Sequence, residues 1–345
     1  MSRIVQIGRR QIGDGHPPFI IAEACVNHQG DFSIAQRMVY FAHAMGADAI
    51  KFQMHILDDE MLREVSQSAN FEEPLWDVIA ETNFTTEQHA ALIALCRGLG
   101  IQYLCTPFSR ASADVLDSLG VEAFKTGSGE LTNIPFMRHI AAKGKPVIVS
   151  TGMSMLEEIA ETVAVFKQAG TPLVLTHCVS AYPCPYDRVN LGMVPRLAET
   201  FGVPTGLSCH TPSIYTAIGA TALGACVIEK HFTFDRAQSG PDHRSSIESY
   251  ELGELVKGCR AVWEARGAER KIFPEEQQIV AWARESVVSL APIAKGSRIE
   301  ETMVSVKRPS PGPGAIPAKD LEKVIGTIAK TDIAADRQIL WTEIG

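Results

Sequence analysis

The chain has 345 residues, of which 46% are apolar and 21% are charged, and its formal net charge is −8. This length allows a barrel-sized domain with a large core and one smaller domain, while the apolar runs fall far short of the roughly 20 residues that span a bilayer. The acidic balance without a basic run argues against nucleic acid or an anionic membrane as a partner, although a few local cations could still hold an anionic substrate.

The cysteines and the first residues indicate a reducing compartment. The eight cysteines are scattered and include no Cys-x-x-Cys pair, and several of them, such as Cys105, Cys178 and Cys226, lie inside apolar runs. Free and mostly buried thiols are typical of such compartments. Residues 1–5 lack the long apolar core and the small-residue cleavage site of a secretory signal. We therefore expect a cytoplasmic protein.

Apolar, β-branched runs alternate with helical segments along most of the chain. After a short leader, the expected strands are 19–23, 48–53, 101–106, 121–125, 146–150, 172–177, 204–211 and 225–228. The clearest helices are 31–45, 85–98, 213–224 and 249–267, of which the last should close the domain. Eight such units, each of about thirty to forty residues, predict an α/β fold of the (β/α)8 TIM-barrel type. The acidic segment 56–83 is expected to be an inserted loop without an assigned role.

The composition changes near the C-terminal end. From about residue 286, short apolar runs such as 287–290 and 304–308 are separated by turn residues and by a Pro/Gly-rich loop. This pattern predicts a small, mostly β domain. We place the barrel at 1–280 and the second domain at 281–345, with a linker over about 268–285.

The stretch 206–243 concentrates the residues that could carry chemistry. His210 lies at the polar end of the predicted strand 204–211, and His231 follows the predicted strand 225–228. The carboxyl ends of neighbouring parallel strands lie side by side, so the two imidazoles could share one space. A single histidine is more often a hydrogen-bonded core residue. Two of them at matching strand ends, with Glu229 and Asp242 nearby, favour a site for a divalent metal ion.

Further polar residues lie at or just past the ends of the predicted strands, which is the catalytic face of a barrel. They are Glu23, Lys51, Gln53, Thr106, Lys125, Ser128, Glu130, Ser150, Ser180 and Ser208. Helix caps and turns would explain many of them, but not Lys51 and Lys125, because an unpaired lysine in an apolar run is costly. Two lysines, several hydroxyls and a Gly/Ser turn suit a phosphate or carboxylate ligand. These residues predict a metal-dependent barrel enzyme that acts on a phosphorylated or carboxylated small molecule.

Several separated motifs, in order along nearly the whole chain, resemble the sialic acid synthase family. They are 22–23 with 27–31, 46–53, 125–130, 177–178 with 182–183, and 228–233 with 240–243. The tail with 306–309 resembles the C-terminal antifreeze-like (SAF) domain of that family. One departure is Ser208-Cys209-His210, where family members often have Ser-Asp-His. Cys209 could be a soft metal ligand or a packed thiol, of which the packed thiol is the simpler interpretation.

The resemblance implies that phosphoenolpyruvate condenses with the aldehyde of an N-acetylated hexosamine, first of all N-acetylmannosamine. The products would be a nine-carbon 2-keto acid, N-acetylneuraminate, and phosphate released by C–O cleavage. The implied cofactor is Mn2+ or Mg2+ held by His210 and His231. The implied catalytic residues are Glu23, Glu229, Lys51 and Lys125.

The resemblance also assigns the substrate-binding residues. Those for phosphoenolpyruvate are Lys51, Thr106, Lys125, Ser128, Ser150, Ser180 and Ser208, with Ser180 standing where some members have Asn. Those for the sugar are Gln53, Glu130, Tyr182, Asp242 and Arg308. Arg308 would reach the barrel of a neighbouring subunit in a domain-swapped homodimer, and the alternative is a solvated surface charge.

Three other functions stay open from the sequence. A legionaminic or pseudaminic acid synthase, which uses a diacetamido-trideoxyhexose, would share the motifs for phosphoenolpyruvate and metal. A metal-dependent aldolase or isomerase on a similar barrel would not consume phosphoenolpyruvate. A carbohydrate-binding protein without activity should have lost His210, His231 or Lys125, and all three are present.

Overall fold

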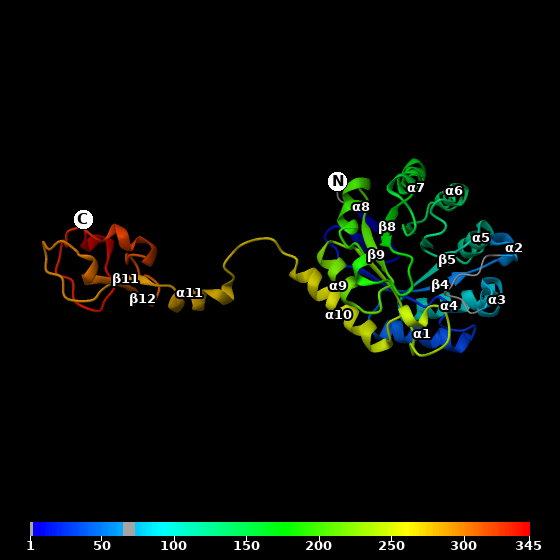
Figure 1. Ribbon diagram of the computed structural model, residues 1–345, viewed down its shortest axis with the longest axis horizontal. Coiled ribbons are helices and arrows are strands. Elements are labelled where there is room, and N and C mark those ends of the chain that lie inside the picture. The colour runs from blue at the N-terminus through cyan, green and yellow to red at the C-terminus, as the bar shows by residue number, and fades with distance from the viewer. Residues whose placement is uncertain (1–2, 65–72) are drawn as a thin grey trace. The chain divides into compact units, whose positions relative to one another are not determined.

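The computed structural model describes residues 3–64 and 73–345. It divides into two compact units, Met1–Gly267 and Ala268–Gly345, and each unit has its own hydrophobic core. Figure 1 shows the strands and helices of both units. Within the described part of the chain, the helices are too short or too polar to cross a membrane.

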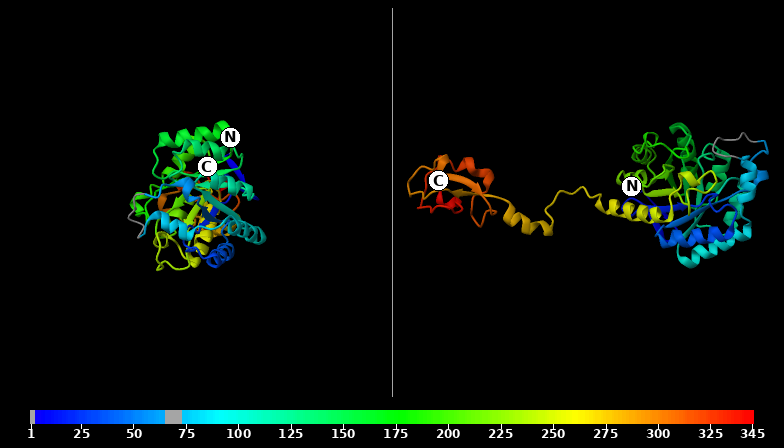
Figure 2. Two further views of the ribbon diagram at one scale, coloured as in Figure 1. Left: turned by 90° about the vertical axis from the view of Figure 1, so that its right-hand side faces the viewer. Right: turned by 60° about the horizontal axis from the view of Figure 1, so that its bottom comes forward.

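The first unit is an eight-stranded parallel barrel, as predicted. The strands follow the order β5-β4-β3-β10-β9-β8-β7-β6, and β5 and β6 at the two ends of this order lie next to each other, so that the barrel is nearly closed. Helices surround the strands in each view of Figure 2. The strands are β3 (Phe19–Glu23), β4 (Ala49–Met54), β5 (Gln102–Pro107), β6 (Phe124–Thr126), β7 (Val147–Ser150), β8 (Leu173–Cys178), β9 (Thr205–Cys209) and β10 (Val227–His231).

The helices of the barrel begin and end at local signals in the sequence. Thr85 and Gln88 form a capping box at the start of α4, and Gly100 ends that helix with a φ of 78°, which glycine adopts without strain. The helices are α1 (Phe32–Ala44), α2 (Leu57–Glu60), α3 (Leu75–Thr82), α4 (Thr86–Leu99), α5 (Arg110–Ser118), α6 (Ile134–Ala141), α7 (Leu156–Ala169), α8 (Met193–Phe201), α9 (Tyr215–Ala222) and α10 (Ser249–Ala265), with 3-10 turns η1 (Tyr186–Arg188) and η2 (His243–Ser245).

The expected leader is instead an antiparallel hairpin of β1 (Ile4–Ile7) and β2 (Arg10–Gly13). Its apolar side chains pack with the first residues of several barrel strands, among them Phe19 and Val227. The hairpin therefore plugs the amino-terminal end of the barrel. The four residues of β1 alternate between exposed and buried, but the exposed Ile4 is apolar, so the sequence itself shows no clear period of two.

The segment 56–83 was expected to be a loop, but its described residues contain α2 and α3. Part of this prediction, residues 65–72, lies outside the described residues. Side chains of α3 become part of the site wall, as described below.

The second unit is small and has few regular strands. β11 (Ser286–Ser289) pairs antiparallel with β12 (Val304–Lys307), and isolated bridges join other segments to it. Ala315 and Leu340 form only an isolated bridge. The remaining elements are η3 (Pro274–Glu276), α11 (Gln277–Ala283), η4 (Glu301–Met303), η5 (Ala318–Lys323) and η6 (Trp341–Glu343). The helix α11 lies within the segment that was expected to be a linker. A helix can form there because residues 277–283 contain neither Gly nor Pro.

Gly206 permits the close pairing of β9 and β10. A Cβ at this position would overlap the backbone of Val227. We expect Gly206→Ala to lower the stability of the barrel by about 1–3 kcal/mol, the usual cost of overpacking, which thermal unfolding followed by circular dichroism would measure. Gly98→Ala is the matched control, because Gly98 lies in α4 with open space around it and alanine favours a helix. An unfolding temperature for Gly206→Ala equal to that of the wild type would contradict this packing.

Candidate active site

A cavity of about 320 Å³ opens at the carboxyl ends of the barrel strands. Most of the residues singled out from the sequence line it. They are Glu23, Lys51, Gln53, Thr106, Lys125, Ser128, Ser150, Tyr182, Ser208, His210, Glu229, His231 and Asp242. A cavity of this size suits a small-molecule ligand.

The strand register places these residues side by side. Glu23 stands opposite His231 on one neighbouring strand and opposite Lys51 on the other. In the same way, Glu229 stands opposite Ser208. Residues that are far apart in sequence therefore meet inside the barrel, because the register aligns them on neighbouring parallel strands.

Two carboxylates and two ammonium groups form a buried cluster in the floor of the cavity. Glu23, Lys51, Lys125 and Glu229 are between 1% and 4% exposed. Lys51 pairs with Glu23 and lies 4.0 Å from Glu229, and Lys125 Nζ lies 3.6 Å from Oε2 of Glu229. Ser208 Oγ donates to Glu229 at 3.1 Å. Each buried charge thus has an opposite charge beside it, which offsets its desolvation.

Burial and pairing shift the pKa values within this cluster in opposite directions. Burial raises the pKa of Glu23 to about 7, and the nearby Lys51 offsets only part of that effect. For Glu229, burial opposes ionisation, but Lys125 and Lys51 together hold its pKa below the ordinary value. Burial lowers the pKa of Lys125, whereas the pKa of Lys51 is raised because Glu229 and Glu23 outweigh burial. Similar groups in different surroundings can then take different roles.

Hydroxyl groups form a second part of the lining. Ser128 Oγ donates to Ser150 Oγ at 3.0 Å and accepts from the backbone N–H of Gly152 at 3.2 Å. Thr106 Oγ1 accepts from Lys51 at 2.9 Å. Ser180 is half-buried beside Gly152, where its Oγ and that of Ser128 would both meet an added Cβ, but it is not among the cavity-lining residues. These groups supply several donors in one place.

His210 and His231 face each other across a third part of the cavity. Their ring centres are 5.3 Å apart, and the Tyr182 ring lies 4.0 Å from that of His210. His210 Nδ1 lies 2.8 Å from the carbonyl oxygen of Val179, which can only accept, so that in the neutral ring Nδ1 carries the proton and Nε2 keeps a lone pair. Burial holds the pKa of His231 well below its ordinary value. A neutral imidazole with a free lone pair is the form that binds a metal.

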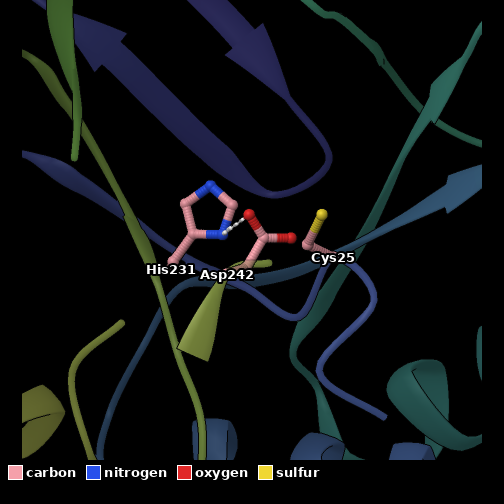
Figure 3. A group of neighbouring side chains, drawn as sticks. All are labelled: Cys25, His231 and Asp242. Atoms are coloured by element: carbon pink, nitrogen blue, oxygen red, sulfur yellow. Dashed lines mark ion pairs between the residues drawn. The ribbon is translucent and has the colours of Figure 1, made fainter. Parts of the chain in front are cut away.

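Among the described residues, one group of three or more His, Cys, Asp or Glu side chains has ligand atoms that all lie within 4.8 Å of one another. It consists of Cys25, His231 and Asp242, all buried. Figure 3 shows these side chains, which come from three separate segments. His231 belongs to the predicted metal pair, whereas His210 is not a member of this group. The sequence analysis did not select Cys25, although it follows Glu23 by two positions.

Three predicted residues have other surroundings. Glu130 does not line the cavity, and its Oε2 is buried beside Gly127 without a hydrogen-bond partner. Arg308 is exposed in the second unit, with its guanidinium 5.3 Å from the centre of the Trp282 ring, and its reach into a neighbouring barrel stays a prediction. Cys209 lies outside the lining, with its sulfur 3.3 Å from Thr211 Oγ1 and 3.2 Å from Thr216 Oγ1, as a packed thiol would.

The structure adds a wall that was not predicted. His55 stacks on Phe108 with ring centres 4.3 Å apart, and its two nitrogens lie 2.8 Å from Glu60 Oε1 and 3.2 Å from Gln53 Oε1. Next to it, apolar side chains complete the wall: Met61, Leu75, Val78 and Ile79. His55 follows a predicted strand directly, but α2 and α3 were expected to be loop, so the wall was not found.

Comparison with known proteins agrees with this arrangement. The model of the NeuB family matches residues 38–271, and that of the SAF domain matches 284–344. The N,N'-diacetyllegionaminic acid synthase of Campylobacter jejuni is 37% identical over 93% of this chain and 98% of its own, and that of Legionella pneumophila is 35% identical over 98% and 97%. The crystal structure of an N-acetylneuraminic acid synthetase from Leptospira borgpetersenii, in complex with citrate, superposes with a TM-score of 0.73, at 32% identity over 81% of this chain and 96% of that one.

Burial raises the pKa of Glu130 from 4.5 to about 7. The folded protein therefore loses stability as the pH rises from the unfolded-state pKa through about 7, because it must then hold a poorly solvated carboxylate. Glu130→Gln cannot ionise, and we expect it to raise the unfolding temperature by several degrees at about pH 8 but to have little effect at about pH 5. Thermal unfolding at both pH values would measure this. Glu161→Gln, at an exposed position of α7, is the control, and an equal gain from Glu130→Gln at both pH values would argue against the titration.

Proposed function

The chain belongs to the NeuB family and carries a SAF domain, and on this premise we propose that it condenses phosphoenolpyruvate with the aldehyde of an N-acetylated amino sugar. The products are a nine-carbon 2-keto acid and phosphate. The observation that carries this proposal is the pair of buried lysines, Lys51 and Lys125, which line one cavity together with several hydroxyl groups. Burial of an ammonium group costs solvation free energy, and a site that binds an anion is a functional reason to keep such a group.

The strand residues supply the groups that phosphoenolpyruvate needs. Its phosphate and carboxylate require many donors, and Lys51 and Lys125 provide charged ones. The hydroxyls that accompany them are those of Thr106, Ser128, Ser150 and Ser208, with Ser180 close to Ser128. We assign phosphoenolpyruvate to this part of the cavity.

The reaction forms one C–C bond and breaks one C–O bond. C3 of phosphoenolpyruvate attacks the aldehyde carbon of the sugar, which leaves an oxocarbenium-like centre at C2. Water adds to C2, and the resulting tetrahedral intermediate expels phosphate and becomes the 2-keto acid. The sugar oxygen gains a proton and the water loses one. Glu23 and Glu229, which flank Lys51, are the carboxylates that can move these protons.

The residues fit a divalent ion. His231 Nδ1 is buried without a hydrogen-bond partner within residues 3–64 and 73–345, and the neutral His210 ring keeps a lone pair on Nε2, as described above. We propose that these two side chains hold Mn2+ or a similar ion. When bound, the ion supplies Lewis-acid polarisation of the sugar aldehyde. The packed, buried thiols of the chain fit the reducing environment of the cytoplasm, where we place the reaction.

Two acceptor sugars are compatible with the motifs. N-acetylmannosamine is the acceptor that the sequence suggested first. The apolar wall of Met61, Leu75, Val78, Ile79 and Phe108 favours the second, a diacetamido-trideoxyhexose, because its extra methyl groups can pack there. Both relatives named above as N,N'-diacetyllegionaminic acid synthases agree with that choice. No described arginine lines this cavity, but Arg236 and Arg244 line a second cavity that shares Val78, Tyr182 and Pro241 with it. A 6-phosphorylated acceptor is therefore tested beside the other two.

The test of this function is phosphate release from phosphoenolpyruvate in the presence of a divalent ion. Each candidate sugar is tested separately: N-acetylmannosamine, its 6-phosphate and the diacetamido-trideoxyhexoses. We expect release with one of the unphosphorylated sugars, most rapidly with a diacetamido-trideoxyhexose, and loss of release with EDTA. In isotopically labelled water, the phosphate should carry no label, because the C–O bond breaks.

Failure of every sugar with folded, metal-loaded protein would overturn the synthase proposal. Cleavage of a keto sugar without phosphoenolpyruvate would identify a metal-dependent aldolase instead. Label in the phosphate would indicate simple hydrolysis of the phosphate ester.

We also propose that Arg308 contacts the acyl group of the sugar from the SAF domain of a partner subunit. Arg308→Ala should raise the KM for the sugar at least about tenfold, as expected for a charged hydrogen bond, and leave the KM for phosphoenolpyruvate unchanged.

Lys125→Met should abolish activity. In mixed dimers of the two variants, one site has both an intact barrel and an intact Arg308, so random pairing should restore about a quarter of the wild-type activity. If mixing restores none while dimers exchange, the arginine acts within its own chain or not at all.

A further inference from the structure

We propose that the Cys25 thiolate and the Asp242 carboxylate bind the divalent ion together with His231. A sulfur, nitrogen and oxygen ligand set would make the site selective for Zn2+, Co2+ or Fe2+ over Mg2+. The inference deepens the proposed function and depends on it for the reaction that the ion serves.

The three side chains converge from three segments at the same end of the barrel. Cys25 follows β3, His231 is the last residue of β10, and Asp242 lies in the loop before η2. Their ligand atoms lie within 4.8 Å of one another, and all three side chains are buried. Thiolate, imidazole and carboxylate are the usual protein ligands of Zn2+ and related ions.

His231 provides an independent indication of a ligand. Its Nδ1 is buried, has no hydrogen-bond partner among the residues that the structure describes, and lies 4.0 Å from Oδ1 of Asp242. The residue is only 6% exposed. A buried polar atom without a partner destabilises the folded protein, and a metal ion bound at this nitrogen would remove that cost.

Hydrogen bonds behind the ligands hold their backbones in place. Asn27 Nδ2 donates to Ser246 Oγ at 2.9 Å, and Ser246 Oγ in turn donates to the carbonyl oxygen of Asp242 at 2.7 Å. Asn27 Nδ2 also donates to the carbonyl oxygen of Phe232, next to His231. One amide therefore ties the segment of Cys25 to the segments of the other two ligands. Such outer contacts are what orient metal ligands in proteins.

The backbone of Cys25 is unusual for a residue with a side chain. Its φ is 44°, in the left-handed region where glycine is the ordinary choice. The backbone N–H of Cys25 donates to Glu23 Oε1 at 2.7 Å, which holds it in this conformation. The chain thus places a thiol beside His231 at a position where glycine would cost less.

The ligand types determine which ion is preferred. Mg2+ requires oxygen ligands in near-octahedral geometry and does not favour a thiolate, whereas Zn2+, Co2+ and Fe2+ accept sulfur and nitrogen. Two anionic ligands also match the charge of a divalent ion. The sequence alone implied only two histidines, a set that discriminates much less between these metals.

The test uses Co2+ as a spectroscopic probe of the full-length protein without substrates. A thiolate bound to Co2+ gives a charge-transfer band in the near ultraviolet. We expect this band in the wild type and in Cys209→Ser, the matched control with a packed thiol outside the cavity lining. Cys25→Ser and Cys25→Gly should lack the band and bind Zn2+ at least about tenfold more weakly. Cys25→Gly keeps the experiment interpretable if serine disturbs folding, because glycine suits the left-handed backbone.

Three results would overturn the proposal: a wild type that binds no Co2+, Co2+-loaded wild type without the band, or a band that survives both Cys25 substitutions. Loss of the band only in Cys178→Ser would also overturn it, because the Cys178 sulfur lies 3.8 Å from His210 and the thiolate would then come from that side. Since the spectra need no substrate, these results are separable from the phosphate-release assay. The synthase reaction could fail with the thiolate site intact, or proceed without it.

Discussion

The buried pairing of Lys51 and Lys125 with Glu23 and Glu229 is the constraint on which the site depends. Four charged groups out of contact with water are tolerable only if each meets an opposite charge. The strand register places Glu23 beside Lys51 on the adjacent strand, whereas Lys125 on β6 reaches Glu229 on β10, a strand that is not its neighbour in the sheet. A shift of one residue in any of these strands would turn its charge toward the apolar layer under the helices. The same pairing that stabilises the empty cavity leaves two ammonium groups available to an anionic substrate.

The cavity has two halves with different origins. The charged and hydroxyl groups come from the strands themselves, whereas His55, Glu60 and the apolar side chains come from the segment beyond β4. Strand residues are fixed by the barrel ladder, and loop residues can vary without harm to the fold. Under the proposed function, this division assigns phosphoenolpyruvate to the strands and leaves the choice of sugar to the loops.

Much of this could be predicted from the sequence, for identifiable reasons. The strands are near-continuous apolar runs, so the sequence predicts where they end and which polar residues lie there. The resemblance to the family is confirmed by the family model. The hairpin β1–β2 was missed because four-residue strands give a weak periodic signal. Cys25 was missed because its importance depends on a left-handed backbone and on the loop that brings Asp242 beside it, which are tertiary features. The position of Arg308 relative to a barrel depends on subunit assembly, which local sequence patterns do not encode.

The hairpin β1–β2 fills the amino-terminal end of the barrel and so limits the route by which substrates can enter. With that end filled by Val5, Ile7 and Ile12, both substrates of the proposed reaction must pass through the opposite mouth. In the proposed reaction, the strand residues in the floor are assigned to phosphoenolpyruvate and the wall beyond β4 to the sugar. A sugar bound first would then obstruct the floor, and this arrangement favours an order in which phosphoenolpyruvate binds before the acceptor.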